Sequence, residues 1–213
     1  MGQSTDVDVL VVGAGPSGLV LAGELRRHGL SVRVVDASAG PAKESRALVV
    51  HARTLEILDD LGVGDEFVAA GRKLVGATLW ANGEALVRAD FDELDTRHPY
   101  LLAISQAETE RLLSELLSER GAKVERDTQL VSFRQDGTGV SATLKTPAGE
   151  ATCRTAWIVG CDGARSTVRR VLDIPFEGAT YDDRFLLYPV GIAIIITQLQ
   201  FNLNSTVRRL ALS

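Results

Sequence analysis

The sequence has 213 residues, a length that suits one large domain. Its composition, 45% apolar and 24% charged residues, is ordinary for a globular protein. Its 28 acidic and 23 basic residues give a net charge of −5, which argues against nucleic acid as the main partner because no basic excess can neutralise phosphates. Cys153 and Cys161 are too few for a disulfide framework or a cysteine zinc site, so we expect a reducing, cytoplasmic setting.

The N-terminal part predicts a strand, a glycine-rich turn, a helix and a second strand. Val7–Val12 is an apolar run broken only by one aspartate, of the kind that is buried on both faces of a parallel sheet. The turn Gly13–Gly18 leads into a predicted helix over Ser17–His28, and Ser31–Asp36 predicts the second strand. Together these elements form a βαβ unit.

The middle of the chain predicts short helices, a hairpin and one long helix. Residues 37–50 are expected to be a loop. Gln106–Glu119 is the clearest helix, because Ser105 and Glu108 form a capping box at its start. The other predicted elements are helices over Arg53–Leu61 and Asp65–Ala70, and strands over Leu74–Trp80 and Glu84–Phe91 that are joined by Asn82-Gly83.

The next segment predicts an antiparallel meander and then a buried strand. The meander strands are Thr128–Arg134, Val140–Thr146 and Glu150–Arg154. Trp157–Cys161 is typical of a buried strand, and a helix is predicted over Ala164–Leu172. We therefore predict an α/β fold in which a Rossmann-like domain carries an added antiparallel β-meander.

The glycine turn matches the pattern G-x-G-x-x-G between a strand and a helix. Its residues are Gly13, Ala14, Gly15, Pro16, Ser17 and Gly18. The first glycine permits a tight turn, the second lets the backbone approach a pyrophosphate, and the third lets the helix pack on the strand. Asp36 ends the second strand, where an acidic side chain accepts hydrogen bonds from an adenosine ribose. This context favours a dinucleotide site over a plain turn with a surface aspartate.

Asp162 and Gly163 form a second candidate site after the buried strand. They lie at the carboxyl end of the predicted sheet, where ligands bind in α/β folds. Asp162 could accept ribose or ribityl hydroxyl groups, and Gly163 would allow a close approach of the backbone. Asp162 is equally suited to cap the following helix, and the local residues leave both roles open.

The run Gly160–Arg169, together with the glycine turn, resembles the FAD-dependent aromatic hydroxylases, which are the group-A flavoprotein monooxygenases. Within this family the chain looks most similar to bacterial polyketide and antibiotic hydroxylases. The resemblance covers Val7 to about Leu187. Three further stretches are similar to the family: Glu44–Glu56, Gln106–Leu112 and Phe176–Tyr181.

The resemblance implies that the chain binds FAD, that NAD(P)H reduces it, and that oxygen from O₂ is transferred to an aromatic ring. The glycine turn would then hold the pyrophosphate and Asp36 the adenosine ribose. Arg46 and Gln106 match FAD-contacting residues of the family, although a solvated loop charge and a helix start are their simpler explanations. Asp162 and Gly163 match a motif shared by flavin and nicotinamide binding. Catalytic residues stay open, and no metal site is expected.

Members of this family are much longer, and the sequence shows neither their second sheet nor their later flavin motif. We therefore expect an incomplete FAD-binding domain over residues 1–187 and a non-family tail over residues 188–213. Residues 191–196 are expected to be an unpaired apolar segment that promotes self-association. A membrane span over Phe185–Asn204 is disfavoured by its proline, glutamine and asparagine residues.

The predicted function is the FAD-binding portion of an NAD(P)H-dependent aromatic-ring monooxygenase, truncated and inactive alone. In the full-length family the partner is a small aromatic substrate. Two alternatives stay open: an NAD(P)-dependent reductase that shares only the Rossmann turn, and a non-catalytic dinucleotide-binding or interaction module.

Overall fold

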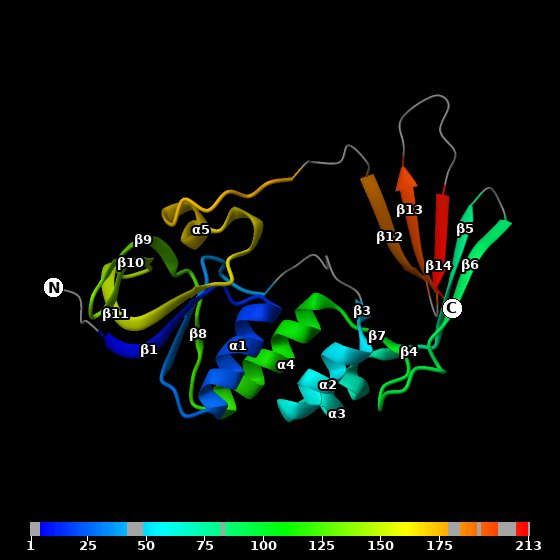
Figure 1. Cartoon of the computed structure of the whole chain (residues 1–213), viewed down its shortest axis with the longest axis horizontal. Helices are drawn as coiled ribbons and strands as arrows, with labels where there is room; N and C mark the ends of the chain where they lie inside the picture. Colours follow the sequence, from blue (N-terminus) through cyan, green and yellow to red (C-terminus); the bar gives the residue numbers. More distant parts are fainter. Residues whose placement is uncertain are drawn as a thin grey trace.

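The computed structural model describes residues 5–41, 49–81, 84–178, 184–190, 193–199 and 208–212 of the chain. Two sheets lie toward opposite ends of the molecule, and the longer helices lie between them (Figure 1). Among the described residues, no helix is both long and apolar enough to cross a membrane.

The larger sheet has six strands in the order β8-β2-β1-β11-β10-β9. Its strands are β1 (Thr5–Val12), β2 (Val32–Val35), β8 (Val124–Glu125), β9 (Gln129–Asp136), β10 (Gly139–Thr146) and β11 (Gly149–Gly160). β8, β2, β1 and β11 are parallel, whereas β10 and β9 are antiparallel additions at one edge. This arrangement confirms the predicted α/β fold with a Rossmann-like sheet and an antiparallel meander.

Strand β1 is buried on both faces, which explains the apolar run in its sequence. Val9 and Val11 belong to one core cluster, which includes side chains of the two longest helices. Leu10 and Val12 belong to a second cluster with side chains of the meander. The alternation follows the two-residue period of a strand, so each face of β1 supports a separate core.

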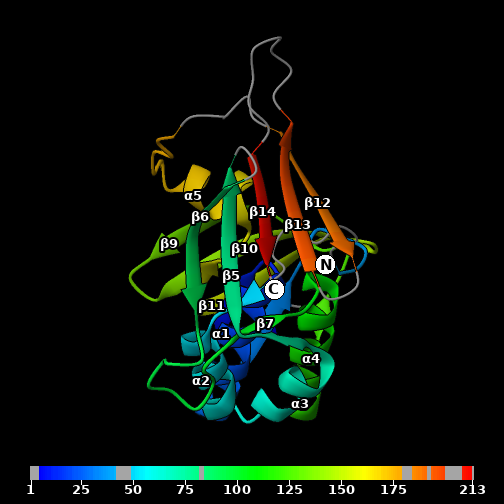
Figure 2. The ribbon, with the colours of Figure 1, turned by 90° about the vertical axis from the view of Figure 1, so that its right-hand side faces the viewer.

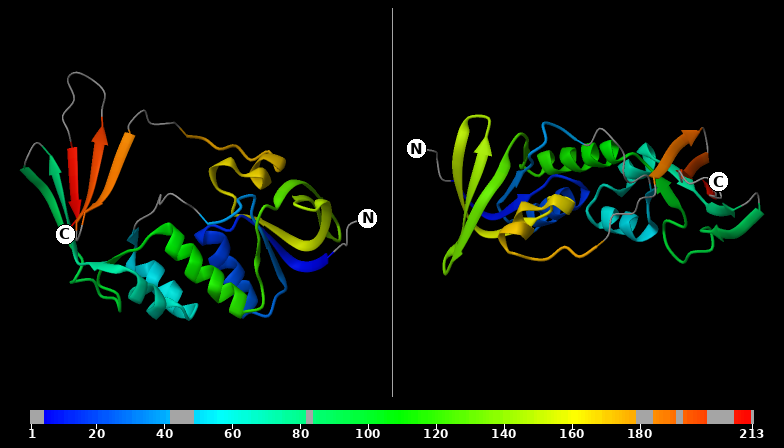
Figure 3. Two further views of the ribbon diagram at one scale, coloured as in Figure 1. Left: turned by 180° about the vertical axis from the view of Figure 1, so that it is seen from behind. Right: turned by 90° about the horizontal axis from the view of Figure 1, so that it is seen from above.

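The helices are α1 (Pro16–Arg27), α2 (Ala52–Asp60), α3 (Gly64–Ala70), α4 (Gln106–Glu119), the 3₁₀ turn η1 (Gly163–Arg165) and α5 (Thr167–Val171). α1 and α4 lie side by side (Figure 3), and α5 packs against β9 and β11. The predicted cap is confirmed at the start of α4, where the Ser105 hydroxyl accepts the N–H of Glu108 at 3.2 Å, whereas the Glu108 carboxylate accepts from Arg111 at 3.0 Å. The helix predicted over Ala164–Leu172 is divided, because Ser166 ends η1 and caps α5 by accepting the N–H of Arg169 at 3.0 Å.

Strand β11 is continuous where the sequence predicted two strands. The predicted strands Glu150–Arg154 and Trp157–Cys161 are joined through Thr155 and Ala156, and β11 ends at Gly160. The predicted burial of the second strand is wrong at Trp157, whose side chain faces solvent and leaves the residue 71% exposed. The N-terminal part of β11 pairs with β10 and its C-terminal part pairs with β1. Thr155 is only 3% exposed, and its hydroxyl oxygen lies 3.0 Å from the carbonyl oxygen of Asp8. A polar residue can therefore lie inside this sheet, because the neighbouring strand satisfies its hydroxyl group.

Two smaller sheets complete the described structure. The three-stranded sheet has the order β3-β7-β4, and the five-stranded sheet has the order β12-β13-β14-β5-β6 (Figure 2). Their strands are β3 (Val49–Val50), β4 (Arg72–Leu74), β5 (Gly76–Ala81), β6 (Glu84–Asp90), β7 (Leu101–Ala103), β12 (Arg184–Val190), β13 (Ala193–Leu199) and β14 (Arg208–Leu212). The sequence did not predict β3, β7 or β8, which are only two or three residues long.

The five-stranded sheet corrects two predictions, that the chain has no second sheet and that the segment 191–196 is unpaired, because its described residues 193–196 belong to β13. β13 pairs antiparallel with β12 on one side and with β14 on the other. β14 also pairs with β5, so Arg208 lies opposite Ala81. Pairing between such distant segments leaves no local sequence signal. The predicted boundary after residue 187 falls inside β12 and stays a prediction, and the predicted turn Asn82-Gly83 lies outside the described residues.

Candidate functional site

A cleft of about 940 Å³ lies at the carboxyl ends of β1, β2 and β11. Three loops form much of its lining: the glycine turn, residues 36–41 after β2, and residues 161–163 after β11. This is the edge at which α/β sheets bind ligands, because the loops of adjacent parallel strands meet there. The structure thus brings the glycine turn, Asp36 and Asp162-Gly163 together around one cleft.

The glycine turn has the geometry that its pattern predicts. A Cβ atom on Gly13 would lie 2.3 Å from the carbonyl oxygen of Cys161, and one on Gly18 would lie 2.0 Å from the carbonyl oxygen of Gly13. Both positions therefore exclude any side chain. A Cβ atom on Gly15 would meet no described atom within 4 Å, so the backbone there is open to the cleft.

Helix α1 begins beside this open space. Gly15 is its N-cap residue and Pro16 its first residue, and no side chain caps the helix within the described structure. Backbone N–H groups at a helix start lack partners in the helix, and together with the helix dipole they favour an anion. The start of α1 can therefore bind a phosphate group that enters next to Gly15.

Asp36 joins two walls of the cleft. Its Oδ2 accepts the N–H of Ala14 at 2.7 Å, and its Oδ1 accepts the N–H of Ser38 at 2.8 Å. The Asp36 side chain is 16% exposed, and Oδ1 lies 3.7 Å from an Nη atom of Arg126. This carboxylate thus fixes the glycine turn against the loop after β2, a role that the sequence did not predict. Its predicted contact with a ribose stays a prediction.

Asp162 accepts hydrogen bonds from the start of α5, whose N-cap residue is Ser166. Its Oδ1 accepts the Ser166 hydroxyl at 2.5 Å, and its Oδ2 accepts the N–H of Thr167 at 2.6 Å. Gly163 has φ +71°, and a Cβ atom there would meet nothing within 4 Å, so its backbone is open. Asp162 therefore supports the start of α5 through Ser166 and Thr167 without being its N-cap residue, and its ligand-binding role stays a prediction.

Gln106 lines the cleft as the first residue of α4, and its Nε2 donates to Oε1 of Glu110 at 2.8 Å. Glu110 also lines the cleft and is only 3% exposed, although the sequence analysis did not select it. Its spacing was the available signal, because it precedes Leu113 by three residues and so shares the apolar face of α4. Arg46 lies outside the described residues, and its predicted contact with FAD stays a prediction.

Arginine side chains that the sequence analysis missed also line the cleft: Arg126, Arg165 and Arg170. Arg170 is held by Ser166, whose carbonyl oxygen accepts its Nε–H at 3.2 Å. Arg126 follows the two-residue strand β8, whose brevity hid its place at the sheet edge. The cleft therefore carries guanidinium groups in addition to the start of α1, and both favour an anionic ligand.

Cys161 lies in the same cleft, directly after β11. Burial raises the pKa of its thiol, and the negative charge of Asp162 raises it further. A thiol in this environment stays protonated at neutral pH and is a poor nucleophile. Cys161 therefore serves as a small packing residue between the two loops.

The sequence pattern of the family described as FAD binding domain matches residues 6–198 of this chain. The chain belongs to this FAD-binding domain family. The match extends past residue 187, where the resemblance seen in the sequence was predicted to end. FAD is the cofactor of the family, in agreement with the prediction.

Several curated relatives of this FAD-binding domain chain are bacterial monooxygenases. The 12-dehydrotetracycline 5-monooxygenase/anhydrotetracycline 6-monooxygenase of Streptomyces rimosus is 44% identical over 171 residues, which are 80% of this chain and 33% of the relative. Rifampicin monooxygenase of Streptomyces venezuelae is 41% identical over 80% of this chain and 35% of its own length. Pentachlorophenol 4-monooxygenase of Sphingobium chlorophenolicum is 36% identical over 90% of this chain and 36% of its own length. The chain spans about a third of the length of these relatives.

Solved structures of similar proteins share the fold of the FAD-binding domain chain. The anhydrotetracycline hydroxylase OxyS of Streptomyces rimosus superposes with a TM-score of 0.77 at 37% identity, over 98% of this chain and 45% of that chain. The p-nitrophenol 4-monooxygenase PnpA of Pseudomonas putida DLL-E4 superposes with a TM-score of 0.83 at 26% identity, over 99% of this chain and 58% of that chain. Both likenesses include the part of the chain that forms β12, β13 and β14.

The residues of the cleft fit the ADP half of FAD. Gly15 leaves open space next to the uncapped start of α1, which suits a pyrophosphate. Asp36 lies at the end of β2, and each of its carboxylate oxygens accepts one backbone N–H from the described residues, which leaves lone pairs for a further donor. The described residues thus supply a donor set for the pyrophosphate and an acceptor for a ribose.

Proposed function

We propose that this chain forms the FAD-binding portion of an NAD(P)H-dependent aromatic-ring monooxygenase. The observation that carries the proposal is the open backbone at Gly15, which lies at the uncapped start of α1 inside a cleft that Asp36 also lines. Membership of the FAD-binding domain family supports the choice of FAD over other dinucleotides. When bound, the flavin supplies the redox chemistry, and the protein supplies binding and orientation.

In this proposal each part of the cleft has one task. The glycine turn and the N–H groups of α1 bind the pyrophosphate, and Asp36 accepts hydrogen bonds from the adenosine ribose. Gln106, oriented by Glu110, contacts FAD from α4, and Arg46 contacts it from the loop before β3. The Asp162-Gly163 turn serves flavin and nicotinamide binding, with Gly163 offering open backbone.

The proposed substrate class is small aromatic compounds. The names of the relatives support it, since they specify 12-dehydrotetracycline, anhydrotetracycline, rifampicin and pentachlorophenol. We also propose that the five-stranded sheet β12-β13-β14-β5-β6 belongs to the substrate side of the enzyme, because it lies apart from the nucleotide-binding sheet (Figure 1). A cytoplasmic location completes the proposal and is supported by the free thiols of Cys153 and Cys161.

A substitution at Gly15 tests the proposal. Gly15 has φ −72°, which any residue adopts, so Gly15→Val should fold while filling the space where a phosphate would enter. The purified chain should bind FAD, measured by quenching of flavin fluorescence, and Gly15→Val should weaken this binding by at least about tenfold, the effect of losing charged hydrogen bonds.

The matched control is Gly137→Val, because a Cβ atom on Gly137 also meets nothing within 4 Å but Gly137 lies in the β9–β10 turn, outside the cleft. This variant should bind FAD like the unmodified chain. A folded chain that binds no FAD, or a Gly15→Val variant with unchanged affinity, would refute the proposed function. The absorption spectrum of the bound cofactor separates FAD from a nicotinamide nucleotide.

A further inference from the structure

We propose that an apolar groove beside the nucleotide cleft binds an α-helix, and that this helix belongs to the part of the related monooxygenases that lies outside the match to this chain. The groove has a volume of about 560 Å³ and is lined mainly by α1, α2, α4 and β3. The docking of the helix is independent of the proposed function, whereas its expected effect on FAD rests on that function.

The walls of the groove are stripes of side chains on two helices. Val20, Leu21 and Glu24 line it from α1. Thr54, Ile57 and Leu58 line it from α2. Residues three or four positions apart lie on one face of a helix, so each stripe follows the axis of its helix. The side chains of a further helix can pack into the spaces along such stripes.

The chemistry of the groove suits an apolar partner. Among the described residues that line it, Glu24 is the only one with a charged side chain, and its carboxylate already binds Arg27 at 2.6 Å. Ile57 is 40% exposed, whereas Val20 and Leu21 are half-buried beside the first core cluster. A partner with an apolar face would cover these side chains and extend that core.

A helix fits the groove better than a strand does. Among the described lining elements the only strand is β3, which has two residues and lies at the edge of its sheet. A strand added to β3 would therefore gain few backbone hydrogen bonds. A helix forms its backbone hydrogen bonds internally and needs only side-chain contacts with the groove.

The comparison with OxyS indicates where the helix comes from. OxyS superposes on 98% of this chain, so it contains counterparts of the elements that form the groove, but the superposition covers only 45% of OxyS. More than half of OxyS therefore lies outside the superposition and can supply a covering helix. An apolar surface that stayed open would favour association with other molecules, so a partner within the same enzyme is the simplest cover.

The groove and the nucleotide cleft share a wall. Gln106 lines both, and Pro16 of the groove follows directly after Gly15 of the cleft. A helix in the groove would therefore reach the start of α1, where the pyrophosphate is expected to bind. By holding α1 and α4 in place it should favour FAD binding, and FAD should favour docking by the same factor.

A chimera in which this chain replaces the superposed part of OxyS tests the docking. Ile57→Cys is introduced into the chimera and into the 213-residue chain, each with Cys153→Ala and Cys161→Ala. A maleimide should modify position 57 at least about tenfold more slowly in the chimera, because a packed side chain reacts only after local opening. Mass spectrometry of the peptides measures the modification at this position.

Gly137→Cys is the matched control. Gly137 lies in the turn between β9 and β10, outside the groove, and a Cβ atom there would meet nothing within 4 Å. In the same two backgrounds, the cysteine at position 137 should react equally fast in the 213-residue chain and in the chimera. Thermal melting of each protein shows that it is folded.

The part of OxyS outside the superposition, expressed separately, tests the coupling to FAD. When it is added, the 213-residue chain should bind FAD about tenfold more tightly by flavin fluorescence, a usual size for such coupling. Ile57→Glu should keep the FAD affinity of the chain alone, because Ile57 does not line the cleft. It should lose the gain, because an apolar partner would bury its carboxylate.

Two results would overturn the docking. One is equal modification of position 57 in the 213-residue chain and in a folded chimera. The other is a 213-residue chain that self-associates and becomes monomeric in Ile57→Glu, because the occupant of the groove would then be a second copy. Slow modification of position 57 in a chimera that binds no FAD would support the docking and refute the proposed function, together with the coupling.

Discussion

The carboxylates of the cleft are already hydrogen-bonded by the protein before any ligand arrives. Asp36 accepts two backbone N–H groups, Asp162 accepts a hydroxyl group and a backbone N–H, and Glu110 accepts the amide of Gln106. Such bonds fix the orientation of each acceptor, so a nucleotide that binds there need not first order the side chains. The cleft is therefore preorganised at the level of single residues.

Cys161 allows a test of the electrostatics inside the cleft. Its thiol pKa is raised above the ordinary value of 9.0 by burial and by Asp162, so the reactive thiolate should form only in alkaline solution. In a Cys153→Ala background, alkylation by iodoacetamide should be slow at pH 8 and should still accelerate above pH 9. Adding Asp162→Asn should shift this profile toward lower pH. A rate that is already maximal below pH 8 would contradict the assignment.

The sequence identifies cleft residues well where the residue type and the local spacing form a known motif. It identifies them poorly where a residue is recognisable only from contacts made in the folded chain. The glycine turn and Asp36 follow a recognisable spacing, and the structure places them around one cleft. Arg126 follows a strand of only two residues, and Glu110 interrupts an apolar face. The role of Arg126 depends on the distant loop after β2, whereas Glu110 is marked only by its position on the apolar face of α4, four residues after Gln106.

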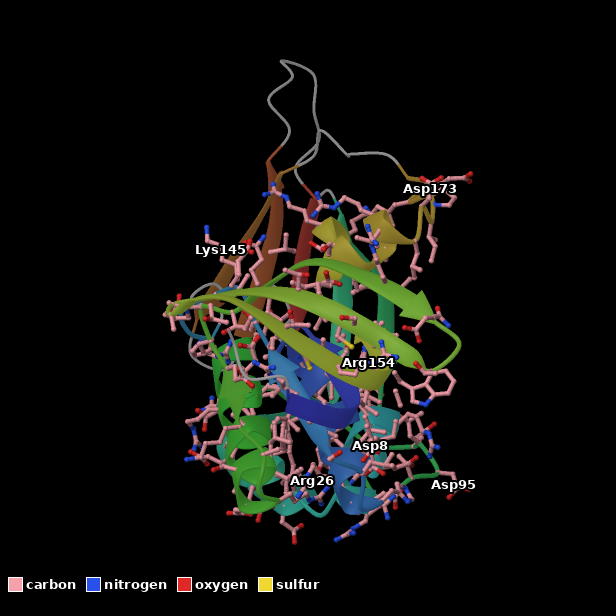
Figure 4. The ribbon with its side chains drawn as sticks, turned by 90° about the vertical axis from the view of Figure 1, so that its left-hand side faces the viewer. Asp8, Arg26, Asp95, Lys145, Arg154 and Asp173 are labelled. Carbon is pink, nitrogen blue, oxygen red and sulfur yellow. The ribbon has the colours of Figure 1, made fainter. Side chains whose placement is uncertain are left out.

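At the scale of elements, an ion pair on the outer side of the six-stranded sheet reinforces the pairing between the meander and the parallel strands. Arg154 on β11 donates from both Nη atoms to the two carboxylate oxygens of Asp136, each at 2.9 Å. Asp136 also accepts the N–H of Thr138 at 2.8 Å and so holds the turn between β9 and β10. Figure 4 shows Arg154 on this outer surface. These contacts fix the β9–β10 turn to the strand that reaches the cleft.

Because of this ion pair, we expect the stability of the folded chain to depend on pH in the acid range. The bonds from Arg154 and Thr138 hold the pKa of Asp136 well below its ordinary value of 3.8. A lowered folded-state pKa gives stability that is complete above the unfolded value and is lost as the pH falls through the folded value. Asp136→Asn should therefore lower the melting temperature at pH 7 by about 1–3 °C, because an exposed pair contributes little.

Thermal unfolding at a series of pH values checks this prediction. The difference between Asp136→Asn and the unmodified chain should be constant from pH 7 to pH 5 and should shrink below pH 3.8, as the unfolded chain binds a proton first. Asp92→Asn, a change at another exposed aspartate, serves as the control and should not alter the melting temperature. A difference that grows in acid would contradict the sign of the pKa shift.

At the scale of the whole molecule, the two larger sheets have separate strand sets. The six-stranded sheet carries the cleft, whereas the five-stranded sheet combines β5 and β6 with strands from residues 184–212. No strand belongs to both sheets in the described structure. Nucleotide binding and the integrity of the five-stranded sheet should therefore be separable.

A deletion tests this separation. Removing residues 191–213 takes β13 and β14 away and leaves β12 and one edge of β5 without their partners. Affinity for FAD should stay within about threefold of the full chain, while the unpaired edges should promote self-association, because open strand edges pair with other chains. Light scattering after gel filtration measures the association state. Loss of all FAD binding would show that the second sheet supports the cleft.

The position of β11 also determines when the cleft can form during synthesis of the chain. β11 lies between β1 and β10, and Thr5 of β1 pairs with Cys153 of β11. On the ribosome, β1 must therefore wait until nearly three quarters of this chain has been made before it gains its second neighbour. Until then a nascent chain can form the glycine turn, but Cys161, Asp162 and Gly163 are missing from its surroundings. The nucleotide cleft is thus completed only once β11 has been made, well after its glycine turn.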